Sequence, residues 1–258
     1  MVRLYIVKIG GSLITKKHLT NPSLNKKNIK QLSSEIARAY SRNKFRLILI
    51  NGAGSYGHVL AERYKLNEGL KNKNQIRALA LTQALVNQLN ANFCTALVKE
   101  GIPAFPIQAS AIAVMKNKKI KSFNYLIISK ILDLGLVPVL YGTPAYDEKL
   151  GCSILSGDYI LSYLAKKMAA DKAIFASDVD GLYVDNKLIR KLDRNQLRKL
   201  LGHISTSKNV DVTGGMKGKV NNILTLKNIE CYILNGSAKD RLYACMSSNK
   251  TISTTIRL

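Results

Sequence analysis

Residues 45–64, FRLILINGAGSYGHVLAERY, place three glycines and a histidine between an apolar run and a segment of helical spacing. Gly52, Gly54 and Gly57 form the pattern G-x-G-x-x-G, which indicates a dinucleotide site when a carboxylate follows about 20 positions later, at the end of the next strand. The next predicted strand, 102–107, carries no carboxylate, so the sequence does not support a dinucleotide site. Glycines at a helix start still let backbone N–H groups approach an anion, and His58 adds a side-chain donor. This turn is therefore predicted to bind a phosphate, with a purely structural histidine as the alternative.

Two further glycine turns lie next to lysines. One follows the first apolar run and combines a lysine, two glycines and a serine: Lys8, Gly10, Gly11 and Ser12. The other, DVTGGMKGKV, places Gly215 and Lys219 at the head of a segment with helical spacing. Neither turn matches G-x-x-x-x-G-K-S/T, which excludes a P-loop fold. Glycine turns with lysines, in a chain without a candidate covalent nucleophile, indicate phosphoryl transfer, where catalysis is mainly positioning and charge neutralisation.

Two acidic motifs complete the set of residues that a phosphoryl-donor site and a phosphoryl-acceptor site would need. SGDYI contains Asp158, and SDVDGLY contains Asp178 and Asp180. An aspartate by itself is as often a helix cap or a turn former. The sequence therefore leaves the functional and the structural interpretation of these aspartates open.

The elements that must position these residues follow from the apolar pattern. Runs rich in Val, Ile and Leu recur between segments of helical spacing, which is typical of a mainly parallel sheet covered on both faces by helices. The predicted strands are 4–9, 45–50, 102–107, 136–141, 172–177 and 229–234. Two long helices are predicted around 29–40 and 79–97, with Val86 among their core residues, and the basic segment 114–124 is predicted to form a hairpin. We therefore expect an α/β fold, a three-layer αβα sandwich around a mainly parallel open sheet.

The composition narrows the class of partner. The chain of 258 residues has 40 Lys and Arg against 16 Asp and Glu, a net charge of +24, which suits nucleic acid, a membrane surface or a phosphorylated metabolite. The basic residues are scattered, so specific nucleic-acid binding is not expected. No apolar run approaches the roughly 20 residues of a membrane span. The four cysteines lack the spacing of a zinc site: Cys94, Cys152, Cys231 and Cys245. We expect a cytoplasmic protein with reduced thiols and no membrane association.

The order of the motifs KIGGS, GAGSYGH, SGD, SDVDGLY and DVTGGMKGK resembles the amino acid kinase superfamily over nearly the whole chain. The ending G-S-aromatic-G-H further resembles the isopentenyl phosphate kinase branch, in which the histidine binds the phosphate of the acceptor. Kinases of carboxylates, such as acetylglutamate kinase, lack this histidine. The alternative is a fosfomycin kinase or a kinase of another small phosphate or phosphonate. The non-enzymatic alternative, a basic nucleic-acid-binding or regulatory protein, would not need Lys8, Asp158 and Lys219 together.

The resemblance implies an ATP-dependent kinase that converts isopentenyl phosphate to isopentenyl diphosphate in isoprenoid biosynthesis, by the alternate mevalonate pathway. Dimethylallyl phosphate is a further acceptor that it suggests. It also implies Mg²⁺ bridging the ATP oxygens, held by phosphate and water rather than by protein ligands. A homodimer is expected from the resemblance alone. Residues 1–168 would form the acceptor-substrate lobe and residues 169–258 the nucleotide-binding lobe, within one continuous sheet.

Position by position, the resemblance also implies the site residues. Those implied for ATP are Lys8, Gly10, Gly11, Ser12, Gly54, Asp178, Gly215 and Lys219. Those implied for the acceptor are Ala53, Gly54, His58, Gly157 and, for its hydrocarbon part, Ile154. Those implied in catalysis, with Asp158 orienting the lysines, are Lys8, Lys17, His58, Asp158 and Lys219. The chain departs from the family pattern at Tyr56, where Phe is usual, and at Lys16, where an acidic residue is common, so either Lys16 or Lys17 could reach the transferring phosphate; spacing favours Lys17.

Overall fold

The computed structural model describes residues 2–16, 21–184, 186–201 and 215–258. Its main sheet contains β1 (Arg3–Ile9), β2 (Phe45–Asn51), β3 (Ala104–Pro106), β6 (Val137–Tyr141), β9 (Lys172–Ser177), β12 (Lys191–Asp193), β13 (Glu230–Asn235) and β14 (Ser253–Arg257). These strands lie in the order β12-β14-β13-β9-β1-β2-β6-β3. Every neighbouring pair is parallel except β13 and β14. The predicted mainly parallel open sheet is confirmed.

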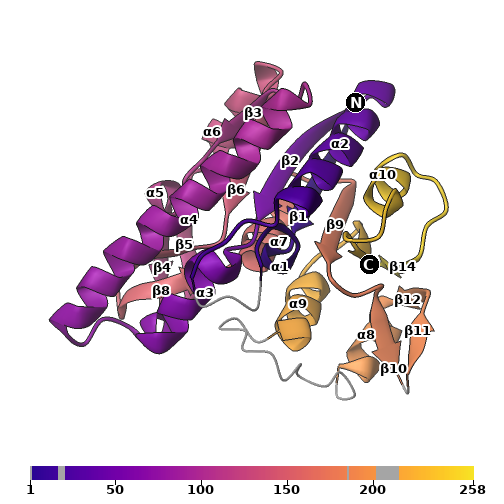
Figure 1. The fold of residues 1–258 in the computed structure, drawn as a ribbon. Helices are drawn as coiled ribbons and strands as arrows, with labels where there is room; N and C mark the ends of the chain where they lie inside the picture. Colours follow the sequence, from indigo (N-terminus) through magenta and orange to yellow (C-terminus); the bar gives the residue numbers. More distant parts are fainter. Residues whose placement is uncertain (1, 17–20, 185, 202–214) are drawn as a thin grey trace.

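Helices cover both faces of this sheet (Figure 1). One layer contains α2 (Lys26–Arg42), α4 (Lys73–Lys99) and α10 (Arg241–Met246), and the other contains α6 (Tyr125–Asp133), α7 (Gly157–Lys167), α8 (Arg194–Leu200) and α9 (Gly215–Leu224). Side chains alternate along a strand, so Leu4 and Ile6 of β1 enter one core whereas Tyr5, Val7 and Ile9 enter the other. The three-layer αβα sandwich predicted from the sequence is confirmed.

The predicted elements are found at the expected places. The six predicted strands correspond to β1, β2, β3, β6, β9 and β13, and the two long helices to α2 and α4. The basic hairpin is formed by β4 (Ala113–Lys116) and β5 (Lys119–Phe123), which pair antiparallel and extend with β7 (Thr143–Asp147) and β8 (Gly151–Leu155) into a second sheet.

A buried carboxylate holds the turn of this hairpin. Asp147, at the end of β7, accepts hydrogen bonds from the backbone N–H groups of Asn117 and Lys118, at 2.9 and 2.8 Å, and from those of Lys149 and Leu150. Burial alone raises the pKa of Asp147, but these hydrogen bonds outweigh it and lower the pKa to about 2. The carboxylate is therefore charged at neutral pH and ties the two hairpins of the second sheet together.

The remaining elements are short: α1 (Gly11–Ile14), α3 (Gly54–Arg63), η1 (Leu66–Glu68), α5 (Ala109–Ile112), β10 (Leu182–Val184) and β11 (Lys187–Ile189). The four cysteines are buried and free. No helix in the described ranges is both long and apolar enough to cross a membrane. The division near residue 168 stays a prediction; β9, which follows it, pairs directly with β1.

Candidate active site

A pocket lies where the central parallel strands end. The last residue of a strand, or the first residue after it, lines the pocket at β1, β2, β6 and β9: Gly10, Gly52, Gly142 and Ser177. Carboxyl ends of parallel strands meet at one edge of a sheet, which is where α/β proteins place their ligands. The pocket encloses about 510 Å³, enough for a small molecule.

Every residue that the resemblance assigns to the site, where the structure describes it, lines this one pocket; Lys16, the alternative to Lys17, is exposed and is not among the lining residues. The assigned residues come from five places in the chain: Lys8, Gly10, Gly11 and Ser12; Ala53, Gly54 and His58; Ile154, Gly157 and Asp158; Asp178; Gly215 and Lys219. Lys17 lies outside the described residues. The structure thus brings the predicted residues together, and their individual roles remain predictions.

The first two glycine turns contact each other through their backbones. A Cβ atom added at Gly11 would lie 2.2 Å from the backbone N of Gly54, and one added at Gly52 would lie 2.5 Å from the N of Gly11. Side chains cannot fit at such distances. Gly54 also has a φ of +49°, a conformation that other residues adopt only with strain. These positions need glycine because the segments after β1 and β2 touch.

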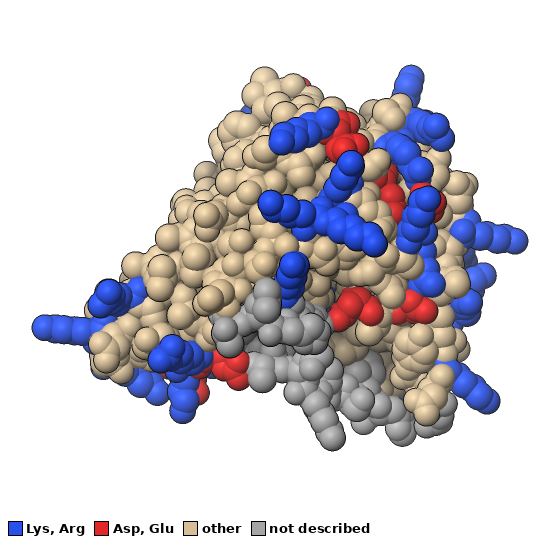
Figure 2. All heavy atoms as spheres, in the orientation of Figure 1, with Lys and Arg blue, Asp and Glu red and all other residues tan. Residues whose placement is uncertain are grey.

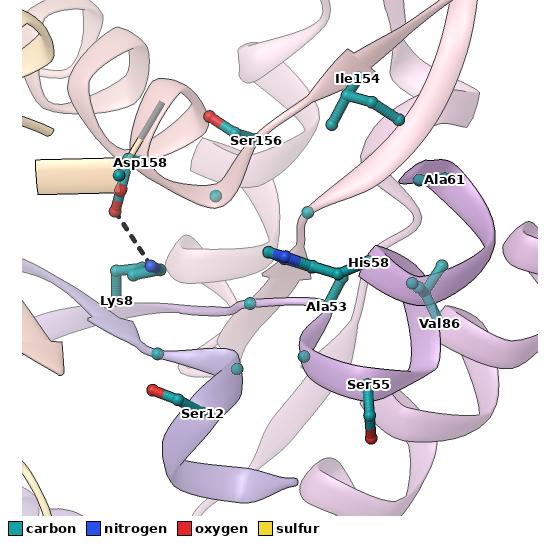
Figure 3. A pocket seen from close by; sticks show the side chains of 18 of the residues that line it. Lys8, Ser12, Ala53, Ser55, His58, Ala61, Val86, Ile154, Ser156 and Asp158 are labelled. Carbon is teal, nitrogen blue, oxygen red and sulfur yellow. Dashed lines mark ion pairs between the residues drawn. The ribbon is translucent and has the colours of Figure 1, made fainter. Parts of the chain in front are cut away.

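His58 lies later in its helix than the sequence predicted. Helix α3 begins at Gly54, so Gly54 and Gly57 lie in its first turn and His58 belongs to the second. At Gly57, α3 packs too closely against α4 and Ala53 to accommodate a side chain. An added Cβ would lie 2.6 Å from the Ala53 Cβ and 2.9 Å from the Val86 Cγ1 of α4. Figure 3 shows the imidazole of His58 projecting from α3 into the pocket.

Two lysines converge on Asp158. The Nζ of Lys8 lies 3.1 Å from Oδ1 of Asp158, and the Nζ of Lys219 lies 2.9 Å from Oδ2 (Figure 3 shows the first pair). Burial alone raises the pKa of Asp158, but the charges of Lys219 and Lys8, and their hydrogen bonds, hold the pKa well below its ordinary value. Ser156 caps α7 by accepting the backbone N–H of Tyr159, which fixes Asp158 in the first helical turn. The charged carboxylate holds lysines from β1 and α9 side by side.

The segment after β9 forms another side of the pocket. Asp178 lines it, and the Oγ of Ser177 is buried there without a hydrogen-bond partner in the described part of the chain. Asp180 accepts hydrogen bonds from the Nη1 of Arg241 at 2.5 Å and the Nδ2 of Asn235 at 3.1 Å. The two aspartates of the SDVDGLY motif therefore differ, since one lines the pocket and the other fastens its segment to α10 and β13.

One end of the pocket is apolar. Ala61 of α3, Val86 of α4 and Ile154 of β8 gather on the side away from the ion pair (Figure 3). Val86, predicted as a core residue, is buried and also lines the pocket. Thr143 and Pro144, which follow β6, also line the pocket and were not predicted as site residues. The available signal was the predicted strand 136–141, whose end shares the edge of the sheet with the glycine turns.

Comparison with known proteins identifies the family. The sequence profile described as the amino acid kinase family matches residues 3–235. An isopentenyl phosphate kinase of Methanothermobacter thermautotrophicus is 32% identical over 265 aligned positions, which cover 97% of this chain and 98% of that protein. One of Methanocaldococcus jannaschii is 35% identical over 250, covering 94% and 95%. An X-ray structure of an isopentenyl phosphate kinase superposes with a TM-score of 0.84 at 29% identity, covering 98% of this chain and all of that one. The chain therefore belongs to the amino acid kinase family and, within it, to the group of the isopentenyl phosphate kinases.

Proposed function

We propose that this protein transfers the γ-phosphoryl group of ATP to isopentenyl phosphate, giving ADP and isopentenyl diphosphate. One observation carries the proposal: His58 lies in a single pocket between an ion-paired end and an apolar end (Figure 3). An acceptor with a phosphate and a short hydrocarbon part matches this order, because the phosphate needs positively charged donors and the hydrocarbon needs apolar surface. Relatives at 32% and 35% identity are named for this activity.

The donor is assigned to the end of the pocket between β1 and α9. Lys8 and Lys219, held by Asp158, would offset the charge of the ATP phosphates. The residues assigned to ATP are those expected from the resemblance: Lys8, Gly10, Gly11, Ser12, Gly54, Asp178, Gly215 and Lys219. Lys17 keeps its assignment to the transferring group as a prediction.

The acceptor phosphate is assigned to the start of α3, with Ala53, Gly54 and His58, and to Gly157 across the pocket. The first N–H groups of a helix have no partner inside the helix, and its dipole favours an anion there. Ala61, Val86 and Ile154 would contact the hydrocarbon part; here Ile154 keeps the role expected from the resemblance. The two substrates would thus meet beside His58.

The chemistry then follows from charge. An oxygen of the acceptor phosphate attacks the γ-phosphorus of ATP, the bond from this phosphorus to the β,γ-bridging oxygen breaks, and ADP leaves with the electron pair. The attacking oxygen is already ionised near neutral pH, so no protein base has to take a proton. The main barrier is repulsion between two anions, which Lys8, Lys219 and His58 would reduce. Asp158 holds the two lysines in place.

Mg²⁺ belongs to the proposal as an ion held by the substrate. The described residues contain no group of three or more His, Cys, Asp or Glu side chains that could hold a metal ion. Asp158 is already paired with two lysines, so its oxygens are not available as cation ligands. These observations fit a Mg²⁺ ion that is bound by ATP oxygens and water instead of by protein side chains. When bound, Mg²⁺ would neutralise part of the charge on the ATP phosphates.

Several finer predictions accompany the proposal. They are dimethylallyl phosphate as a second acceptor, a homodimer, a cytoplasmic location, and the acceptor lobe 1–168 beside the nucleotide lobe 169–258. The comparisons do not favour a fosfomycin kinase or a non-enzymatic protein. Figure 2 shows Lys and Arg side chains spread over the visible face, with Asp and Glu among them, which supports scattered charge rather than a nucleic-acid footprint.

The test is ATP consumption with four acceptors: isopentenyl phosphate, dimethylallyl phosphate, fosfomycin and acetylglutamate. We expect isopentenyl phosphate to give the highest kcat/KM and acetylglutamate to give essentially none. Equal turnover of acetylglutamate would contradict the assigned acceptor. A parallel titration with duplex DNA at physiological salt should give a Kd no tighter than about 10⁻⁶ M, and sequence-selective binding far below this value would favour the nucleic-acid alternative.

A further inference from the structure

A buried hydroxyl connects the two glycine turns that contact each other. Thr15 follows α1 and is 1% exposed. Its Oγ1 donates a hydrogen bond to the carbonyl oxygen of Gly11 at 2.8 Å and accepts one from the backbone N–H of Ser55 at 3.1 Å. Gly11 belongs to the turn assigned to ATP, and Ser55 belongs to the first turn of α3, assigned to the acceptor. One side-chain atom therefore contacts both turns.

This hydroxyl also lies against Gly54, at the contact between the turns. A Cβ atom added at Gly54 would lie 2.2 Å from the Oγ1 of Thr15 and 2.8 Å from the carbonyl oxygen of Gly11. A hydroxyl has one proton, so donation to Gly11 leaves its lone pairs for the N–H of Ser55. Ser55 is itself buried, and a buried N–H that loses its acceptor is costly. Without the oxygen of Thr15, the N–H of Ser55 would lose this acceptor at the start of α3.

We propose that Thr15 is a positioning residue that sets the separation between the γ-phosphate of ATP and the acceptor phosphate. The inference rests on the proposed function, because it needs the two turns to hold the two substrates. A misplacement of about 1 Å in reacting groups can cost about 10²-fold in rate. Looser spacing would also admit water. A water oxygen would then attack the γ-phosphorus, the bond to the β,γ-bridging oxygen would break, and ADP, inorganic phosphate and a proton would form.

The test compares variants that keep or remove the hydroxyl. Thr15→Val, close to threonine in shape, should lower kcat by about 10- to 100-fold, with a smaller change in KM for either substrate. It should also raise the ratio of ADP formed to isopentenyl diphosphate formed above one, because part of the ATP reacts with water. Thr15→Ser keeps the hydroxyl and should restore a ratio of one. A residue that only stabilises the fold would not change this ratio in folded protein.

Thr254→Val is the matched control. Thr254 is fully buried, and its Oγ1 likewise accepts a backbone N–H, from Leu182 at 2.8 Å, and donates to a carbonyl oxygen, that of Ile189, at 2.5 Å. It joins β14 to the β10–β11 region instead of the glycine turns. Thr254→Val should lower the Tm about as much as Thr15→Val and keep the ratio at one.

Two results would overturn the inference: wild-type kcat with a ratio of one in Thr15→Val, or equal uncoupling in Thr15→Ser and Thr15→Val. If Thr15→Val does not fold, Thr15→Ala removes the same hydroxyl without adding a methyl group, and the same ratio decides. The wild-type protein tests the proposed function separately. Failure to phosphorylate isopentenyl phosphate refutes that function, whereas an active and fully coupled Thr15→Val variant refutes this inference alone.

Discussion

Two sides of the pocket are built in different ways. On the glycine side, residues 10–15 and 52–58, backbone packs against backbone. A Cβ added at Gly11 would lie only 2.2 Å from the backbone N of Gly54. The ion-pair side, formed by Asp158, Lys219 and residues 177–181, is held by charged side chains, including the pair of Asp180 with Arg241. Close-packed backbone cannot deform gradually, whereas a partly exposed ion pair such as that of Asp180 with Arg241 can weaken by degrees. We therefore expect abrupt losses on the glycine side and graded losses on the ion-pair side.

The largest effect should come from Gly54→Ala. The new Cβ would lie 2.2 Å from the Oγ1 of Thr15, and the residue would keep a φ of +49°. Left-handed strain costs about 1–2 kcal/mol and overpacking about 1–3 kcal/mol, so we expect the free energy of unfolding to fall by roughly 2–5 kcal/mol. Both substrates would be displaced, and kcat/KM should fall by more than about 10³-fold. Chemical denaturation and steady-state kinetics measure the two losses.

Gly101→Ala separates strain from packing. Gly101 has a φ of +86°, but nothing lies within 4 Å of an added Cβ. This control should lose only the strain of about 1–2 kcal/mol and keep wild-type kinetics. If Gly54→Ala behaves like Gly101→Ala, the glycine side is less tightly packed than its backbone distances indicate, and the contrast between the two sides fails.

Lys219→Met should have the next largest effect. It removes a cation that lies 2.9 Å from Asp158, and we expect kcat to fall by about 10²- to 10³-fold because charge on the transferring oxygens loses a preorganised partner. Lys217→Met, an exposed neighbour in α9, is the control and should remain near wild type. A normal kcat for Lys219→Met with a low kcat for Lys217→Met would mean that the wrong lysine of this helix has been assigned to ATP.

His58→Ala tests a side-chain contact on the glycine side. Loss of one hydrogen bond to a charged group costs about 1.5–3 kcal/mol, so kcat/KM for isopentenyl phosphate should fall by roughly 10- to 200-fold while KM for ATP stays almost constant. His58→Gln keeps a donor without a charge and should lose less. A histidine needed only for packing would lower the Tm and leave the kinetics of the folded protein unchanged, so melting curves beside the assays distinguish the two.

The same contrast explains what could be predicted from the sequence. Parallel strands bring their carboxyl ends to one edge, and the glycine turns that follow β1 and β2 meet there. The Thr15 contact with Ser55 joins residues 40 positions apart, and no local pattern encodes it. Strand β14 was not predicted because its buried positions include Ser253 and Thr254 instead of an apolar run. The two aspartates of SDVDGLY could not be assigned separate tasks for the same reason, since the partner of Asp180 is 61 positions away.

The smallest effect should come from Arg241→Met. Arg241 lies outside the pocket lining and fastens the segment of Asp178 through Asp180, with the two paired side chains 20% and 29% exposed. A pair of this exposure contributes about 0.2–1 kcal/mol, so KM for ATP should rise by no more than about fivefold, while kcat and KM for isopentenyl phosphate stay near wild type. Arg38→Gln is the control, because Arg38 forms an ion pair of the same 2.5 Å length with Asp240, away from the pocket, and should change neither KM. If Arg241→Met lost as much kcat/KM as Gly54→Ala, the ion-pair side would be as intolerant of displacement as the glycine side. A small displacement of residues 177–181 would then abolish activity instead of reducing it in proportion.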